Sequence, residues 1–363
     1  MVKGELVEGG LRKGVMRLAP SKSHAHRVLI AEFLSGRTRS LVDSPVDCDD
    51  ILATKRCLRT LAAKETTLDC NESGTTRRLL GPVVAALGVT PNWVMRGKLA
   101  SRPQIDYANL KPGVQELPGD VSSQFVSGLL FALPILEGDS EIRLTTPLAS
   151  RGYVEMTLDV LKTYGIDVRE TKTGFEIPGC QTYVAPAEGP QIEGDWSGAA
   201  FLIAMKTLGN DITIGEQFSL SETSRQPDKA IVDLLGRTNL DVDACPDIFP
   251  ILAMAAATRA EDTRFTGTRR LRIKESDRTA AMADVLERFG VRTEVFEDAF
   301  VVHGTGRLVA TAPFNSYADH RIAMSIAVGA TRAEGDVMID NTICAAKSFP
   351  TFFEDFNQLE RIK

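Results

Sequence analysis

Apolar residues along the chain fall into helix-period segments, each of which ends in a short polar turn. Glycine in these turns, as at Gly138 and Gly209, is typical of a helix that has just ended. Alternation after the turn, clearest over residues 141–144, predicts a half-buried strand. The segments that predict buried helices are residues 28–34, 128–136, 201–208, 251–257 and 322–330.

A second pattern repeats within the chain. Residues 160–168 match residues 285–292, and in both a helical segment closes on Gly before a strand-like segment begins. The repeats predict about six α/β units of roughly 50–75 residues each. The length of 363 residues fits two domains. Since no low-complexity linker separates them, we expect strands that cross between the domains.

The composition excludes several classes of protein but does not identify the function. No apolar run approaches the ~20 residues that span a bilayer, and the N-terminus lacks a signal-like apolar stretch. The net charge of −6 argues against nucleic-acid binding, which needs a basic surface. We therefore expect a cytoplasmic protein, and a monomer. The six cysteines show no CxxC pair and the four histidines no metal-ligand spacing, so we expect free, mostly buried thiols and no metal.

Several predicted helices in the first half begin with hydroxyl, basic or glycine residues. Residues 20–27 carry Lys22 and Arg27 directly before an apolar helix, and residues 72–80 place Gly74 between hydroxyl groups. Free backbone N–H groups and the helix dipole make such a start an anion site. Each start, taken alone, is equally typical of an ordinary capped helix with solvated charges. Two further starts are residues 119–125 and 149–153.

The second half holds charged groups at similar positions. Asp247 follows a proline at the start of an apolar helix, where an N-cap is the ordinary role. Residues 272–278 carry five charges in seven positions, and residues 319–321 put two potential cations at a helix start. Lys347 lies just before another apolar segment. If these helix starts converge, they would bind substrates rich in phosphate and carboxylate.

Taken in order, these motifs resemble those of the EPSP synthases along nearly the whole chain. No single motif is specific to that family, but eight in sequence with compatible spacing point to it. They are Lys22-Ser23 with Arg27, Gly74-Thr75 with Arg78, Arg102-Pro103, Gly119 to Gln124, Pro246-Asp247, Lys274 to Arg278, Asp319-His320-Arg321 and Lys347 to Pro350.

The resemblance implies an α/β fold of the enolpyruvyl transferase type, an inside-out α/β barrel with sheets outside and helices inside. It has two similar domains, each of three repeated α/β units, which accounts for the repeats in the sequence. One domain is expected over residues 20–192 and the other over residues 1–19 and 193–363. The active site is expected in the cleft between them.

The same resemblance implies transfer of the enolpyruvyl group of phosphoenolpyruvate to the 5-hydroxyl of shikimate 3-phosphate. This step belongs to the shikimate pathway, which leads to chorismate and the aromatic amino acids, and the herbicide glyphosate inhibits the family. No metal or organic cofactor is implied. The two substrates are the implied partners, with neither nucleic acid nor membrane.

The resemblance also implies a role for each residue of this chain that matches a family motif. Asp247 is implied as the base at the alcohol, Glu275 as the acid–base group at the methylene carbon C3, and Lys22 as an aid to proton transfer that neutralises the leaving phosphate. The implied contacts of shikimate 3-phosphate are Lys22, Ser23, Arg27, Ser122, Ser123, Gln124, Ser150, Tyr153, Asp247 and Lys274. Those of phosphoenolpyruvate are Lys22, Gly74, Arg102, Gln124, Arg278, His320, Arg321 and Lys347.

The chain also departs from the family pattern. Glu72 stands where the family usually has Asn, and Arg270 replaces an Asn that contacts substrate in several relatives. His24 and His26 follow the lysine box, and we assign them no role.

Two alternatives remain to be weighed. The transferase that acts on UDP-N-acetylglucosamine shares fold and donor, but its loop cysteine corresponds to Gly97 and its lysine is followed by Asn rather than Ser23. A non-catalytic paralogue would be expected to lose Lys22, Asp247 or Glu275, and all three are present.

Overall fold

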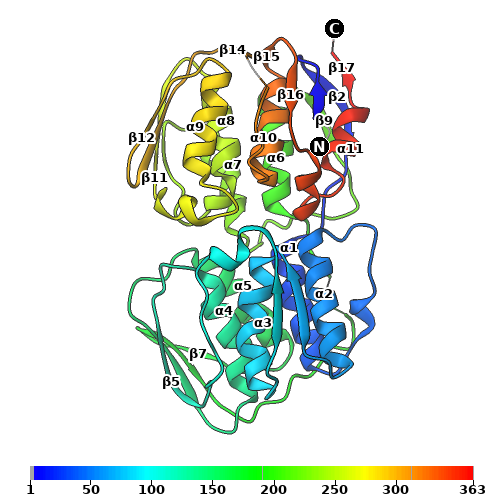
Figure 1. Ribbon diagram of the computed structural model, residues 1–363, viewed down its shortest axis with the longest axis vertical. Coiled ribbons are helices and arrows are strands. Elements are labelled where there is room, and N and C mark those ends of the chain that lie inside the picture. The colour runs from blue at the N-terminus through cyan, green and yellow to red at the C-terminus, as the bar shows by residue number, and fades with distance from the viewer. Residues whose placement is uncertain (1–3, 190, 312, 363) are drawn as a thin grey trace. The chain divides into compact units, whose positions relative to one another are not determined.

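The computed structural model describes residues 4–189, 191–311 and 313–362, and the chain divides into two compact units (Figure 1). Residues 21–192 form the continuous unit, and residues 1–20 with 193–363 form the discontinuous unit. Pro20 belongs to the discontinuous unit, where it pairs with Gly194. The expected domains, residues 20–192 and residues 1–19 with 193–363, stay a prediction. Residues 1–3, 190, 312 and 363 of the expected domains lie outside the described residues.

The continuous unit packs its helices together, with a four-stranded sheet outside them (Figure 1). That sheet has the order β5-β6-β8-β7, in which β5 and β6 are parallel and β8 is antiparallel to both its neighbours, while β3 pairs with β4 in parallel. The helices are α1 (Lys22–Leu34), α2 (Asp49–Ala62), α3 (Gly74–Ala86), α4 (Ser123–Ala132) and α5 (Arg151–Thr163). The strands are β3 (Thr67–Asn71), β4 (Asn92–Met95), β5 (Gly113–Leu117), β6 (Ser140–Leu144), β7 (Arg169–Glu170) and β8 (Gly174–Ile177).

The discontinuous unit repeats this plan. Its four-stranded sheet has the order β10-β11-β13-β12 with the same parallel and antiparallel pairings, and smaller sheets are β17-β2-β9, β1-β16 and β14-β15. The helices are α6 (Trp196–Thr207), α7 (Ile231–Leu234), α8 (Phe249–Ala257), α9 (Arg278–Arg288), α10 (His320–Ala330) and α11 (Phe352–Gln358). The strands are β1 (Glu5–Val7), β2 (Arg12–Met16), β9 (Asp211–Ile214), β10 (Asn239–Asp241), β11 (Asp262–Thr266), β12 (Thr293–Val295), β13 (Ala299–His303), β14 (Leu308–Val309), β15 (Ala333–Glu334), β16 (Val337–Ile339) and β17 (Glu360–Arg361).

The sequence repeat has a structural counterpart. Residues 160–168 close α5 and lead to β7, and residues 285–292 close α9 and lead to β12. Both short strands form the edge of their four-stranded sheet. The predicted α/β class with repeated units is therefore confirmed.

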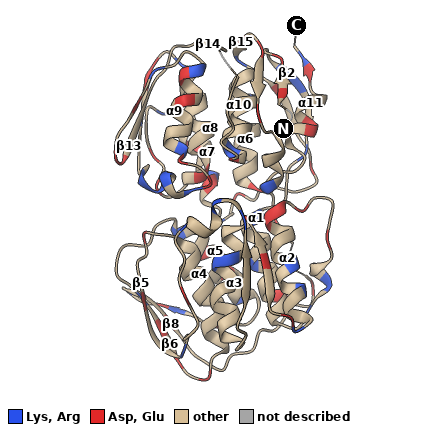
Figure 2. Ribbon diagram, viewed as in Figure 1, with Lys and Arg blue, Asp and Glu red and all other residues tan. Residues whose placement is uncertain are grey.

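The inner helices carry the apolar segments that the sequence marks. Every residue of α8 and α10 is buried, and α4 has no Lys, Arg, Asp or Glu along its length (Figure 2). The predicted helix over residues 128–136 is too long: α4 ends at Ala132 and a 3₁₀ turn covers Leu133–Ile135. Pro134 explains the early end, since it has no N–H to continue the helical bonding. Among the described residues, no helix is both long and apolar enough to cross a bilayer.

Candidate active site

The helix starts of the continuous unit meet through hydrogen bonds at one end of the unit. Lys22, the first residue of α1, donates from Nζ to Oδ2 of Asp50 in α2 at 2.9 Å. In the first turn of α4, Gln124 donates to Oγ1 of Thr75 and accepts from Nη1 of Arg78, both at 2.9 Å and both in α3. The first turns of α1, α3, α4 and α5 contain no acidic residue, which leaves these positive helix ends suited to an outside anion.

Gly74 begins α3 and leaves space beside two guanidinium groups. A Cβ placed on it would be 3.1 Å from Nη1 of Arg102 and 3.5 Å from Nη1 of Arg78. Its φ lies outside the left-handed region, so the backbone conformation does not require glycine. The missing side chain instead opens the N-terminus of α3 next to two cations, as an anionic ligand would need.

Serine residues begin the two other helices of this end. The Ser122 hydroxyl accepts from the Gln124 N–H at 3.3 Å and caps α4, and the neighbouring Ser123 is buried. Ser150 precedes α5 with φ +50°, a strained conformation for a residue with a Cβ. Strain of this kind is concentrated at functional sites, and here it falls on a residue that the sequence had singled out.

Arg27 braces three helices from inside. It is 2% exposed; Nη1 donates to the Ser23 carbonyl at 2.6 Å, and Nη2 to the Tyr153 carbonyl at 2.8 Å. Nε donates to Oγ1 of Thr157 at 2.8 Å. Burial lowers the pKa of Arg27 to about 10, although the interaction with Tyr153 opposes the shift. The guanidinium therefore ties together the backbone of two residues expected to bind the acceptor.

In the discontinuous unit, Asp247 is surrounded by cations. Its Oδ1 accepts from Nη1 of Arg278 at 2.8 Å and from Nζ of Lys274 at 3.3 Å. Its Oδ2 accepts from Nη2 of Arg321 at 3.2 Å. The carboxylate remains 25% exposed, whereas Arg278 and Arg321 are nearly fully buried. The structure thus groups these candidates within one hydrogen-bonded cluster.

Arg278 donates hydrogen bonds to three carboxylates of that cluster. It donates from Nη2 to Glu275 at 3.0 Å and from Nε to Asp319 at 2.9 Å. Burial by itself would lower the pKa of Arg278, but the carboxylates of Asp319, Asp247 and Glu275 outweigh it and raise the pKa. Burial lowers the pKa of Lys274 despite the attraction of Asp247. These charges make the cluster a place where small anions and a base can be held together.

The remaining candidates lie at helix ends in the same unit. His320 begins α10 and is buried, and Arg321 follows it. Lys347 closes the 3₁₀ helix Ile343–Lys347 and is also buried. Among the described residues, no group of three or more His, Cys, Asp or Glu side chains could hold a metal ion.

Sequence reasoning missed two partner residues and left two departures open. Asp50 holds Lys22, and Asp319 holds Arg278; acidic residues directly at predicted helix starts were the available signal. Arg270 donates from Nε to Asp243 at 3.0 Å. The carboxylate of Glu72 lies against Gly97, whose φ is +55°.

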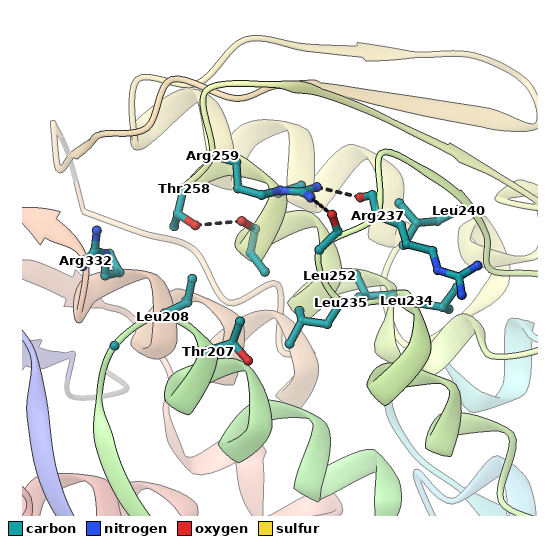
Figure 3. A pocket seen from close by; sticks show the side chains of 14 residues that line it. Thr207, Leu208, Leu234, Leu235, Arg237, Leu240, Leu252, Thr258, Arg259 and Arg332 are labelled. Atoms are coloured by element: carbon teal, nitrogen blue, oxygen red, sulfur yellow. Dashed lines mark hydrogen bonds between the residues drawn. The ribbon is translucent and has the colours of Figure 1, made fainter.

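A cavity of about 460 Å³ lies apart from these residues (Figure 3). It is lined by the C-terminal ends of α6, α7 and α8 and by Arg237, Arg259 and Arg332. Asp247 lies before the opposite, N-terminal end of α8. Because none of the candidate residues lines this cavity, we do not assign it to the substrates.

Comparisons with known proteins agree with the motifs. The family model described as "EPSP synthase (3-phosphoshikimate 1-carboxyvinyltransferase)" matches residues 96–238 and 205–356. A protein of Clostridioides difficile (strain 630) named 3-phosphoshikimate 1-carboxyvinyltransferase is 33% identical over 422 residues, covering 95% of each chain. One of that name from Clostridium acetobutylicum is 34% identical over 413 residues, covering 96% of this chain and 95% of its own.

Solved structures show the same fold at lower identity. An EPSP synthase from Acinetobacter baumannii superposes with a TM-score of 0.74 at 22% identity, covering 99% of both chains. An enolpyruvyl transferase from Streptomyces tendae gives 0.66 at 14% identity, covering 98% of this chain and 97% of the other. Together with the family match and the near full-length relatives, these results show that the chain belongs to the EPSP synthase family.

Proposed function

We propose that this chain is a transferase that moves the enolpyruvyl group of phosphoenolpyruvate to the 5-hydroxyl of shikimate 3-phosphate, releasing phosphate. The proposal rests on family membership, and the Asp247 cluster is the structural observation that carries it. A partly exposed carboxylate held by Lys274, Arg278 and Arg321 supplies both a base and the cations that two anionic substrates need. The step serves aromatic amino acid biosynthesis through the shikimate pathway.

We assign donor binding to groups from both units. Phosphoenolpyruvate carries a carboxylate and a phosphate, and planar arginine forks match both. The space beside Gly74, bordered by Arg102, supports a contact with the donor there. The proposed donor contacts are Lys22, Gly74, Arg102, Gln124, Arg278, His320, Arg321 and Lys347.

Acceptor binding is assigned mainly to hydroxyl groups at helix starts of the continuous unit. Neutral donors such as Ser122 and Ser123, at a helix N-terminus, can hold a phosphate without a further cation. Asp247 and Lys274 are assigned to the alcohol end of the acceptor. The full proposed set is Lys22, Ser23, Arg27, Ser122, Ser123, Gln124, Ser150, Tyr153, Asp247 and Lys274.

The reaction is an addition followed by an elimination. The 5-hydroxyl loses its proton to Asp247 and attacks C2 of the enol, while C3 gains a proton from Glu275. The adduct then expels phosphate from C2, next to the Lys22 ammonium, and a C3 proton returns to Glu275. The proton that Asp247 took from the hydroxyl passes to the departing phosphate, which restores the Asp247 carboxylate. Every proton is then accounted for, and we propose no cofactor.

Phosphate release tests the proposal directly. The purified chain should release phosphate from phosphoenolpyruvate when shikimate 3-phosphate is added and not when UDP-N-acetylglucosamine is added. Release only with UDP-N-acetylglucosamine would identify the alternative transferase, and release with neither would indicate a non-catalytic paralogue. Glyphosate should inhibit the reaction. We further expect a cytoplasmic monomer; light scattering should then give a mass near 39.5 kDa.

A further inference from the structure

Two separate networks of buried hydroxyl groups lie beneath the helix starts of the continuous unit. The donor-side network contains Thr54 of α2 and Thr76 of α3, both 0% exposed. The acceptor-side network contains Ser127 of α4 and Thr157 of α5, also 0% exposed. Neither sequence motifs nor family resemblance assigned a role to these four residues.

The donor-side network runs from α1 to the start of α3. Thr54 Oγ1 lies 2.7 Å from Nδ1 of His26 and 2.7 Å from Oγ1 of Thr76. Thr76 Oγ1 donates to Ser73 Oγ at 2.7 Å and to the Asp50 carbonyl at 3.3 Å. The network therefore ends on Asp50, which holds Lys22, and on Ser73, which precedes Gly74.

The single proton of the Thr76 hydroxyl is available to Ser73 and Asp50 when Thr76 accepts from Thr54. Thr54 in turn accepts from His26 when that ring carries its proton on Nδ1. In either direction, His26 and both threonines form a continuous chain of short contacts that ends at the first turn of α3.

The acceptor-side network centres on Arg27. Thr157 Oγ1 accepts from Arg27 Nε at 2.8 Å, and its single proton is shared between Ser127 Oγ at 2.8 Å and the Tyr153 carbonyl at 3.0 Å. Ser127 Oγ also accepts from Arg27 Nη2 at 3.4 Å. Since Arg27 holds the carbonyls of Ser23 and Tyr153, this network fixes the backbone of two acceptor contacts.

We infer that Thr54 and Thr76 position the phosphoenolpyruvate contacts, and that Ser127 and Thr157 position those of shikimate 3-phosphate. The inference rests on the proposed function and deepens it. A buried hydrogen-bonding group that loses its partner destabilises the local arrangement. No hydrogen bond described above joins the two networks, so a defect in one should affect mainly one substrate; Lys22, which Asp50 holds, is the one residue of the donor-side network assigned to both.

Matched threonine-to-valine variants test this inference. Thr54→Val and Thr157→Val each replace a fully buried hydroxyl by a methyl group of similar size, inside a helix of the same unit. Thr54→Val should raise the KM of phosphoenolpyruvate by about five- to tenfold and that of shikimate 3-phosphate by less than about twofold. Thr157→Val should do the reverse. Thr54→Ser and Thr157→Ser keep the hydroxyl and should restore near wild-type KM values even if they melt earlier.

A purely structural role predicts another result. Both valine variants would then lose melting temperature and turnover without separating the two KM values, and this outcome overturns the inference. It is also overturned if the serine variants fail to restore KM. Should a valine variant not fold, the alanine variant at that position is measured against the same criteria. A wild-type chain that releases no phosphate would instead overturn the proposed function.

Discussion

At the scale of single residues, Asp247 is held by three cations, so its position is fixed while one side of the carboxylate stays open to solvent. Replacing it by Ala should lower turnover by ~10²-fold or more, the usual effect of losing a general base. The fold should survive because the Asp247 side chain is partly exposed and Arg278 keeps Asp319 and Glu275 as partners. Steady-state phosphate release and a melting curve measure the two effects. Asp247→Asn is the control for shape, and unchanged turnover in either variant would remove Asp247 from the mechanism.

Adding one methyl group at Gly74 tests the proposed phosphoenolpyruvate site. In Gly74→Ala the new Cβ meets the end of the Arg102 side chain, which can shift, and no backbone strain arises because φ is not left-handed. Glyphosate is longer than phosphoenolpyruvate and shares its anionic groups, so it has less room beside the methyl. The ratio of glyphosate inhibition constant to phosphoenolpyruvate KM should rise. A flat ratio with a lower melting temperature would mean that Gly74 is only structural.

Sequence motifs predict the roles of some residues but not those of others. Asp247 and Arg278 stand in motifs, and the structure joins them by a hydrogen bond. Arg27 was expected only as a substrate contact, because its partners Thr157 and Ser127 lie 130 and 100 positions away. A bond between residues so far apart along the chain depends on helix packing, which no local pattern reveals.

At the scale of elements, the start of α10 is held under strain. Tyr317 and Ala318 both have left-handed φ, +55° and +52°, directly before the capping residue Asp319. Glycine adopts this conformation without a Cβ clash, so Ala318→Gly should stabilise the protein by roughly 0.5–1 kcal/mol. Ala283→Gly, inside α9, should instead destabilise it by about 1 kcal/mol. Urea unfolding of both variants checks the contrast; destabilisation by Ala318→Gly would contradict it.

Asp319 should make the free energy of unfolding depend on pH in the acidic range. Burial alone would raise the pKa of Asp319, but Arg278 and His320 lower it below the ordinary 3.8. The stability that ionised Asp319 contributes is therefore present above pH 3.8 and is lost as the pH falls through the lower pKa of Asp319 in the folded state. The unfolding free energy should drop below about pH 4, by at most about 1.4 kcal/mol per pH unit from this group.

Asp319→Asn supplies the comparison for that prediction. The variant leaves Arg278 without one buried partner, so it should lose ~3–5 kcal/mol at neutral pH. Its acid dependence should be shallower than that of the wild type. Denaturant unfolding between pH 3 and 7 measures both; parallel curves for the two proteins would show that Asp319 does not titrate as described.

Elements were predictable where periodicity was clear. The apolar segments at residues 251–257 and 322–330 lie within α8 and α10, and residues 141–144 lie within β6. The end of α4 was misplaced because hydrophobicity continues through Pro134, although hydrogen bonding does not. Backbone bonding, rather than the apolar pattern, decides where a helix stops.

At the scale of the whole molecule, the proposed substrate contacts draw on both units. Shikimate 3-phosphate should therefore lower the radius of gyration and strengthen phosphoenolpyruvate binding, since it shifts the population toward a closed state. Small-angle scattering with and without the ligand, together with titration of phosphoenolpyruvate, measures these effects. An identical radius of gyration in both conditions would count against ligand-driven closure.

The division of the chain could not be located from composition, because no linker marks it. The compact units divide between residues 192 and 193 and between Pro20 and Ser21. The domain bounds that the family resemblance implies stay a prediction. Pro20 pairs with Gly194, a contact between residues far apart in sequence that motif spacing does not show.

The contact between Glu72 and Gly97 bears on how this chain can evolve. Any side chain at position 97 would begin 2.6 Å from Cδ of Glu72 and would also adopt a left-handed φ of +55°. A side chain there would require Glu72 to rotate away, which its exposed and flexible side chain allows. The left-handed φ is not relieved by that movement, so it favours glycine at position 97 whatever stands at position 72. The backbone of this loop, rather than the glutamate beside it, therefore disfavours the loop cysteine of the sister transferase.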